Sequence, residues 1–416
     1  MKKIFTLAAV AALVLASCAK IEINQRNVDD PISFRPYSGM PVTKAGKTGE
    51  LNTDSLKVSG FGVFAYQTTG DYSSSATPNF MYNTQVSTAS WTYSPIKYWP
   101  NQIQSGDTDS QPATAYQADK VSFFAYAPWV AATASTGTPT DAVTSGITAL
   151  TSNATAGDPK VSYKVSSDLD SQVDLLWAVS HGTTWTNVAG GDNTPTNGLP
   201  YLNLQKPAIG TAIHFYFRHA LAQLTLKAVA AYNQVAAGGT AQDGVKITIA
   251  SVELTVPGMP QTATLNLNNT TANTPLWENV DATGADLTLT VDGSNLNADL
   301  KDGGAVAAAS QPDGVTATEQ DVIVDGKYYT LIPKATSTTV NVKITYYVTT
   351  DDADLKDGFS RVENVISHDV TFASGFAAGT KNTIKMILGI SEVKFEAEVE
   401  DWTLGVNGEV NLPVNS

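Results

Sequence analysis

Histidines and one acidic loop carry the side chains that would suit acid–base or metal chemistry in this sequence. His214 and His219 lie five residues apart in a stretch typical of a β-strand, so their side chains face opposite sides and cannot hold one metal ion together. The loop Asp351–Asp357 carries four aspartates. An EF-hand would need glycine at the sixth position and glutamate at the twelfth, where Lys356 and Val362 stand. We favour a solvated turn there and leave a calcium ion in this loop as an open alternative.

The usual catalytic motifs are missing from the sequence. It contains no HExxH, GxSxG or P-loop pattern, and no GxGxxG between a strand and a helix. Glycoside hydrolysis needs two neighbouring carboxylates, which any two strands could bring together, but nothing singles out one pair. We therefore expect no catalytic residue, no cofactor and no metal. A hydrolase built on a β-sandwich stays a third hypothesis.

Aromatic side chains gather between Trp91 and Trp99, where Tyr93 and Tyr98 also lie. Exposed rings of this kind can stack on sugars, so Trp91 and Trp99 are candidate glycan contacts. The alternative, which we favour, is that these rings close the edge of a hydrophobic core, because aromatic side chains bury a large apolar surface.

The composition narrows the class of protein. The 416 residues carry a net charge of −14, with 15% charged and 9% aromatic residues. The aromatic content excludes a disordered chain, and the low charge disfavours a coiled coil. An acidic chain repels phosphate backbones, so we expect no nucleic acid among its partners.

The only cysteine, Cys18, ends a segment typical of export. Two lysines precede an apolar run from Ile4 to Ala16, which is too short to span a bilayer but fits a signal peptide over residues 1–17. The ending Leu-Ala-Ser-Cys looks like a bacterial lipobox, which implies cleavage before Cys18 and its acylation. Because alanine and not aspartate follows Cys18, we expect an outer-membrane lipoprotein.

The rest of the chain alternates between apolar and polar residues, which is the period of half-buried β-strands. No amphipathic helix longer than about three turns is evident. The Ala-rich stretch 131–150 is interrupted by turn residues, so we expect loops or single turns there. The pattern predicts an all-β fold made of β-sandwiches. The clearest alternating stretches are 224–228, 340–348 and 393–399.

The alternating pattern also predicts one irregular strand and a boundary between two domains. In the stretch 245–256 the apolar phase changes near Ala250 and Ser251, which predicts a β-bulge or a change of strand partner. The strand density suggests two sandwiches, separated after a long polar, turn-rich stretch. We predict one domain over 46–212 and a second over 213–416.

Short motifs rich in aromatic and turn residues run along nearly the whole mature chain. They are Asp30–Phe34, Val42–Ala45, Phe61–Tyr66, Trp91–Pro100, Val121–Pro128, Asp174–Ala178, Phe217–Leu221, Leu331–Pro333, Gly379–Ile384 and Val399–Trp402. Each motif alone is weak, but in this number and order they resemble the fimbrillin family, the subunits of type V pili. The resemblance implies two transthyretin-like β-sandwich domains in tandem, export as a lipoprotein, and assembly by strand exchange between subunits.

The resemblance also implies that a protease removes the first strand and so opens a groove for a strand of another subunit. That first strand would begin at Ile32, and Ile32 and Phe34 would fill one face of the groove. The cut is expected at Lys44 and Ala45, and we assign residues 18–45 to an N-terminal lipidated propeptide region that includes the removable first strand.

The expected cleavage site departs from the best-known pattern of the family, in which arginine precedes the cut. The residue here is Lys44, so the identity of the protease stays open. Arg35 and Arg26 are fallback sites, although a cut at Arg35 would split the first strand.

The donated strand would come from the tail, residues 403–416. Its apolar residues share one parity, so an extended tail would present one apolar face to a groove. The alternative is that the tail is the last strand of its own domain, with Trp402 as its anchor. The apolar residues of the tail are Leu404, Val406, Val410, Leu412 and Val414.

The leading hypothesis is a structural subunit, stalk or tip, of a cell-surface pilus. Its partners would be other pilin subunits, of the same or another kind, and outer-membrane lipid through Cys18 before processing. The second hypothesis is a surface lipoprotein adhesin that binds a glycan or a host protein and never polymerises. Both hypotheses allow the protein to bind a ligand on a host or bacterial surface.

Overall fold

The computed structural model describes the chain in separate stretches. They are 31–37, 53–87, 90–100, 119–140, 146–187, 190–230, 245–281, 286–298, 319–324, 326–351, 353–388 and 393–402. Several residues singled out above lie outside these stretches: Cys18, Arg26, Lys44, Ala45, Leu404, Val406, Val410, Leu412 and Val414.

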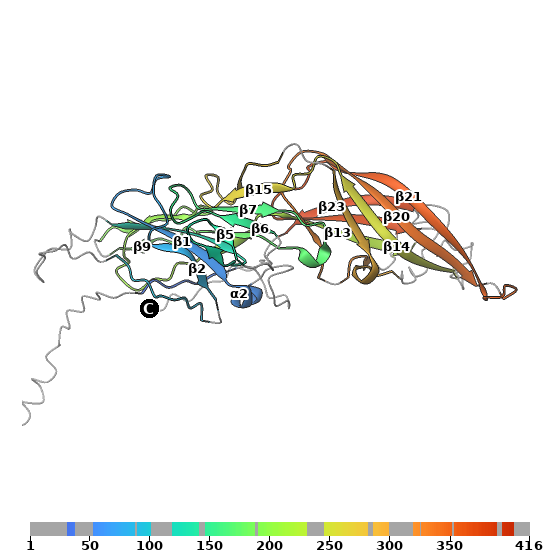
Figure 1. Ribbon diagram of the computed structural model, residues 1–416, viewed down its shortest axis with the longest axis horizontal. Helices are drawn as coiled ribbons and strands as arrows, with labels where there is room; N and C mark the ends of the chain where they lie inside the picture. Colours follow the sequence, from blue (N-terminus) through green and yellow to red (C-terminus); the bar gives the residue numbers. More distant parts are fainter. Residues whose placement is uncertain are drawn as a thin grey trace, which may run out of the picture.

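The prediction of an all-β fold is confirmed: sheets pack in layers along an elongated molecule (Figure 1). Within the described stretches, helix is confined to α2 (Thr53–Ser59) and two 3-10 turns, η2 (Leu169–Ser171) and η3 (Gly293–Asn295). The expectation of loops or single turns over 131–150 was wrong, because short strands occur there. Strands this short contain too few residues for an alternating pattern to show. They are β4 (Ala132–Thr133), β5 (Thr138–Pro139) and β6 (Ile147–Leu150).

The first sheet is buried on both faces. Its order is β12-β8-β3-β1-β2, with β11 also paired to β3, and all of these pairs are antiparallel. In β1, Phe61 and Val63 belong to one hydrophobic cluster, whereas Phe64 and Tyr66 belong to another. The sheet is therefore the middle layer of its part of the molecule. Its strands are β1 (Phe61–Thr68), β2 (Met81–Val86), β3 (Lys120–Ala127), β8 (Leu176–Val179), β11 (Tyr201–Leu204) and β12 (Tyr216–His219).

A second sheet, β16-β15-β7-β6, joins residues that the predicted domain boundary would separate. Strand β7 (Lys160–Lys164) pairs with β15 (Thr262–Asn266), which pairs in turn with β16 (Leu276–Glu278). A division at 212/213 would cut β15 from β7 and β12 from β8, the strands with which they pair. A two-stranded ribbon, β9 (Trp185–Thr186) with β10 (Asp192–Asn193), lies beside the first sheet.

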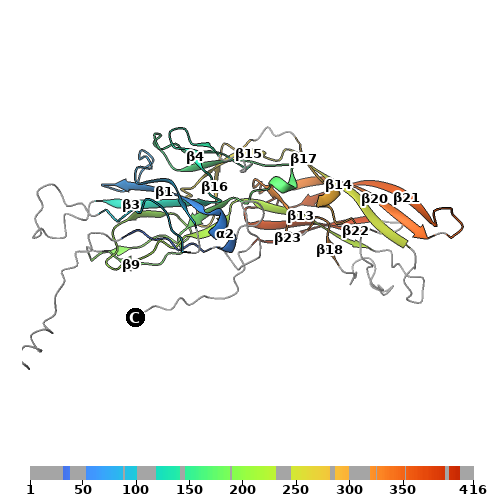
Figure 2. The ribbon, with the colours of Figure 1, turned by 60° about the horizontal axis from the view of Figure 1, so that its bottom comes forward.

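Two further sheets form a sandwich at the other end of the molecule (Figure 2). One has the order β18-β13-β22-β23, with β19 also paired to β13; the other has the order β17-β14-β20-β21. Strands β13 and β22 pair in parallel. The strands are β13 (Ala222–Ala230), β14 (Val245–Val256), β17 (Leu287–Asp292), β18 (Gln320–Asp321), β19 (Tyr329–Leu331), β20 (Thr338–Asp351), β21 (Phe359–Phe372), β22 (Thr380–Leu388) and β23 (Val393–Asp401).

The predicted irregularity in β14 is confirmed. The register between β14 and β20 shifts between Ile249 and Ser251, which leaves Ala250 as the extra residue of a β-bulge. The shift returns the apolar residues on both sides of it to the core face. Ile249, Val252 and Leu254 are all buried there.

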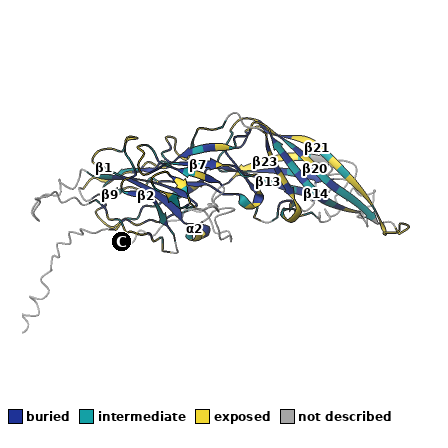
Figure 3. Cartoon of the chain, in the orientation of Figure 1, coloured by how far each residue is buried: buried dark blue, intermediate teal, exposed yellow. Residues whose placement is uncertain are grey.

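Two hydrophobic clusters hold these layers together, and buried residues run along most strands (Figure 3). The larger cluster extends from one face of the first sheet through the second sheet into the sandwich. The smaller cluster lies on the other face of the first sheet and includes Ile32 and Phe34. The N-terminal residues 31–37 therefore belong to the core, although they are remote in sequence from the strands that they contact.

Candidate functional site: the groove that holds residues 31–37

Residues 31–37, here called the first strand, form the edge of the first sheet. They run parallel to the segment 213–217, which leads into β12, with Phe34 opposite Ile213 and Tyr37 opposite Tyr216. The backbone hydrogen bonds are Ile32 N–H to Lys97 O (2.8 Å), Arg35 N–H to Ile213 O (2.9 Å), Tyr37 N–H to Phe215 O (2.7 Å), Ile213 N–H to Ser33 O (2.8 Å) and Phe217 N–H to Tyr37 O (2.9 Å).

The first strand alternates between buried and exposed side chains. Ile32 and Phe34 are 2% and 3% exposed, and Pro36 is buried, whereas Ser33 and Arg35 point to solvent. This is the period-2 pattern of a strand with one face in a core. The structure therefore brings together the two residues that the sequence indicated as groove-filling.

Phe34 is the centre of an aromatic cluster. Its ring stacks on Phe215 with centroids 5.5 Å apart and an interplanar angle of 10°. Tyr93 and Phe123 lie 5.5 Å and 6.0 Å from the same ring. Burial of a side chain of this size contributes roughly 1.5–3 kcal/mol. Phe34 is therefore a major apolar contact of the first strand.

Tyr93 also holds the backbone of the first strand, a role that the sequence did not reveal. Its hydroxyl donates a hydrogen bond to Ile32 O at 2.7 Å, and burial raises the pKa of this phenol. Tyr93 lies on the segment that follows Trp91, and the same segment supplies Lys97 O to Ile32 N–H. The sequence gives little indication of this role, because the hydrogen bond joins two residues that lie 61 positions apart in the chain.

The two tryptophans proposed as glycan contacts have different surroundings. Trp99 is 3% exposed, and its ring packs edge-on against Phe123 at 5.8 Å, so that it faces the core. Trp91 is only partly buried, lies 6.0 Å from Phe61, and has a φ of 53°. A bulky residue rarely adopts that backbone conformation. Of the two rings, only that of Trp91 is partly open to solvent.

Three residues that can carry a positive charge lie beside the first strand. Lys97, His214 and Arg218 lie on the two segments beside it, and Arg35 lies on the strand itself. Burial lowers the pKa of His214, and the positive charge of Arg35 lowers it further. Arg35 and His214 are therefore close enough for like charges to interact.

Trp402, the residue that precedes the tail, packs against His219 at the end of β12. His219 Nδ1 lies 2.9 Å from Asp174 Oδ1, and both side chains are buried. The Trp402 ring stacks on the His219 imidazole with centroids 3.8 Å apart, and the backbone N–H of Trp402 donates to Gly379 O. Trp402 is thus an intramolecular anchor, as the sequence suggested.

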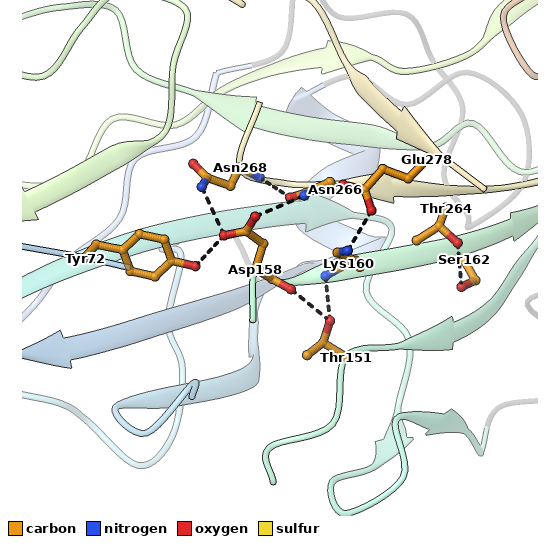
Figure 4. A network of polar contacts seen from close by, with 9 residues as sticks. All are labelled: Tyr72, Thr151, Asp158, Lys160, Ser162, Thr264, Asn266, Asn268 and Glu278. Atoms are coloured by element: carbon orange, nitrogen blue, oxygen red, sulfur yellow. Dashed lines mark hydrogen bonds and ion pairs between the residues drawn. The ribbon is translucent and has the colours of Figure 1, made fainter. Parts of the chain in front are cut away.

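A polar network ties β7 to β15 and β16 (Figure 4). Asp158 accepts hydrogen bonds from Tyr72 (2.9 Å), Asn266 (3.1 Å) and Asn268 (3.0 Å). Glu278 accepts from Asn266 at 2.8 Å and pairs with Lys160 at 2.6 Å. These two partners lower the pKa of Glu278. A general acid would need a raised pKa, so Glu278 fits a structural tie between strands.

The acidic loop 351–357 connects β20 to β21 at the exposed end of their hairpin. In the described stretches, no three His, Cys, Asp or Glu side chains are grouped closely enough to hold a metal ion. Those stretches likewise contain no helix of the length and apolar character that a membrane span requires.

Comparisons with known proteins agree with this architecture. The fimbrillin-like family matches residues 47–402. A fimbrial protein from Bacteroides vulgatus is similar in fold, with a TM-score of 0.58 and 21% identity over 90% of this chain and 99% of that one. A search of the curated proteins found no match.

More distant structures cover the chain equally well. A putative cell adhesion protein from Bacteroides uniformis has 14% identity and a TM-score of 0.40, over 90% of this chain and 98% of that one. The similarity in fold rests on the Bacteroides vulgatus protein, and the family on the match over residues 47–402. The chain belongs to the fimbrillin-like family.

Proposed function

We propose that the chain is a structural subunit, stalk or tip, of a cell-surface fimbrium that polymerises by strand exchange. In this account the chain is exported as an outer-membrane lipoprotein through Cys18, is cut between Lys44 and Ala45, and loses the first strand. The tail of another subunit, residues 403–416, then takes the vacated place.

The observation that carries this proposal is the position of the first strand. It is an edge strand that places Ile32 and Phe34 in the core, and its neighbours lie far along the chain. Its removal would expose the free edge of the segment 213–217 together with two adjoining apolar pockets. A strand with alternating apolar side chains would restore both the backbone hydrogen bonds and the packing.

The tail offers a strand of that kind. Leu404, Val406, Val410, Leu412 and Val414 share one parity, as Ile32 and Phe34 do. Because the anchor Trp402 precedes the tail, a donated tail would leave the fold from a fixed point.

Polymerisation after proteolysis tests the proposal. The full chain would be cut at Lys44 and followed by size-exclusion chromatography beside a matched variant that lacks residues 403–416. We expect polymers only from the cut chain that keeps its tail. Equal polymer from the uncut chain, or from the variant without a tail, would refute strand exchange.

An adhesin is the second candidate, and Trp91 is the observation in its favour. Its partly exposed ring sits on a strained backbone, and strain of this kind clusters at functional sites. We expect that a glycan contact would be lost in Trp91→Ala but kept in Trp99→Phe. A glycan array without signal for the unaltered chain would reject this candidate.

A further inference from the structure

The buried face of the first strand has three positions, and the largest side chain occupies the middle one. Ile32, Phe34 and Pro36 are all buried, whereas Ser33 and Arg35 between them are exposed. Residues that alternate in this way share one face of an extended strand. The groove therefore holds three consecutive side chains along that face, and its middle position accommodates a side chain of aromatic size.

The middle position is enclosed by aromatic rings and is here called the Phe34 pocket. The Phe34 side chain is 3% exposed. Among the described residues, four rings have centroids within 6.3 Å of its own: Phe61, Tyr93, Phe123 and Phe215. They belong to four separate segments of the chain, so the assembled fold sets the spacing between them. The size of this pocket is thus a property of the groove.

The tail repeats the order of side-chain sizes at one place. Val410, Leu412 and Val414 are consecutive residues of one parity, and the largest of them, Leu412, is in the middle. Because a valine stands on each side of Leu412, the order is the same in whichever direction the tail runs. A tail that places these three side chains in the groove puts Leu412 in the Phe34 pocket.

Leu404, the other leucine of the tail, lacks this setting. Two residues before it, Trp402 is stacked on His219. Four residues after it, Gly408 interrupts the apolar face of the tail. An extended chain advances about 3.3 Å per residue, so Leu404 stays within roughly 7 Å of the anchor, whereas Leu412 reaches as far as roughly 33 Å from it. Leu412 is the leucine with the reach to enter the groove of a second copy.

We propose that the Phe34 pocket sets the register of strand exchange and selects the donor by size: Leu412 of a second copy's tail enters this pocket. The inference rests on the proposed strand exchange and adds to it the donor residue that the groove recognises. Leucine is smaller than phenylalanine and brings no ring to the aromatic cluster. The pocket is therefore incompletely filled after exchange, and a donor with an aromatic residue at this position binds more tightly than the tail itself.

The alignment has one cost. If the tail runs in the direction of the first strand, Pro413 stands at the position of Arg35. The N–H of Arg35 donates to Ile213 O at 2.9 Å, and proline has no N–H to replace it. One backbone hydrogen bond is lost in that direction, so the apolar side chains carry more of the binding.

Synthetic peptides with the sequence of residues 403–416 test the register. The full chain, cut at Lys44, would be incubated with each peptide, and the concentration that displaces half of the first strand would be measured. Leu412→Ala should need at least about thirty-fold more peptide than the unaltered sequence, because a buried leucine is truncated. Leu404→Ala is the matched control and should stay within about two-fold. Leu412→Phe should need about two- to ten-fold less.

A spectroscopic measurement locates the leucine without changing its size. Peptides with a ¹³C-labelled leucine at either Leu412 or Leu404 would be bound to the cut chain. We expect the methyl resonances of Leu412 alone to move upfield, because these methyl groups would lie against the ring of Phe215. An upfield shift at Leu404 and none at Leu412 would contradict the proposed register.

The peptide series separates a failure of this inference from a failure of strand exchange. Equal effects of Leu412→Ala and Leu404→Ala, or weaker binding of Leu412→Phe than of the unaltered peptide, would show that Leu412 does not enter the Phe34 pocket. Displacement by the unaltered peptide would still leave strand exchange intact. If no peptide displaced the first strand, both the register and strand exchange would fail.

Discussion

Two edges of the molecule differ in how they are covered. The first strand closes one edge of the first sheet with side chains that are almost fully buried, Ile32 and Phe34. Strand β21 ends the sheet β17-β14-β20-β21 along 14 residues, yet Val362 and Val365 on it are 55% and 54% exposed. One edge is a short segment whose two large apolar side chains are almost fully buried. The other is a long strand that buries Val370 and Phe372 near its end and leaves its two middle valines exposed.

The difference lies in connectivity. Strand β21 follows β20 directly in the chain and pairs with it from Thr338 to Asp351, so local pairing holds it in addition to its buried residues. The first strand pairs with residues about 180 positions away, and only its contacts retain it. In the proposed strand exchange, a segment held in this way would be replaced by another of the same pattern, whereas β21 cannot leave without unfolding its hairpin.

The largest effect is expected at Phe34. Phe34→Ala should destabilise the chain by about 3–5 kcal/mol, because it opens a cavity among Phe215, Tyr93 and Phe123. Denaturant unfolding would measure the change in the free energy of unfolding. A loss below about 1 kcal/mol would show that the first strand is no better packed than β21, and the proposed difference between the two edges would then be wrong.

An intermediate effect is expected at Tyr93. Tyr93→Phe keeps the ring but deletes the hydrogen bond to Ile32 O, which should cost about 1–3 kcal/mol if that buried acceptor is left without a partner. Hydrogen exchange of the first-strand amides should rise relative to those of β21. The rise should be absent in Tyr98→Phe, which keeps an aromatic ring at an exposed position.

On β21 the effect should be small. Val365→Thr preserves the β-branched shape of an exposed side chain, so we expect a change of about 0.5 kcal/mol or less. The same unfolding measurement as for Phe34→Ala serves here. A loss comparable to that of Phe34→Ala would mean that β21 is covered by another segment.

Acid should weaken the first strand selectively and modestly. The pKa of His214 is held below its ordinary value of 6.5 by burial and by Arg35. The released state therefore binds the proton more readily, and retention of the strand is full above about pH 6.5 and declines as the pH falls below that value. Proteolytic sensitivity of residues 31–37 should rise on acidification in the unaltered chain but not in His214→Gln.

Much of the fold could be predicted from local pattern. The alternation in β13 and β20 and the phase change at Ala250 are visible in the sequence because the apolar residues there face the core. The similar alternation in β23 does not indicate burial, because Ala397 and Val399 are exposed. The sequence likewise predicted that Ile32 and Phe34 lie on one apolar face, although it did not show which residues they contact.

What could not be predicted depends on distant pairing. Nothing near Ile32 indicates that Tyr93 holds its carbonyl, or that the segment 213–217 receives the first strand. The pairing of β7 with β15 crosses the expected boundary at 212/213, since strand order depends on the assembled sheets. Trp91 and Trp99 look alike in sequence, and only packing distinguishes them.

The mass of the subunit in assembled fimbriae tests the central claim most directly. Fimbriae sheared from cells would be dissociated and the N-terminus of each subunit determined by mass spectrometry. The account predicts chains that begin at Ala45 and lack both Cys18 and the first strand. Polymerised chains that all begin at acylated Cys18 and still contain Ile32 and Phe34 would contradict it.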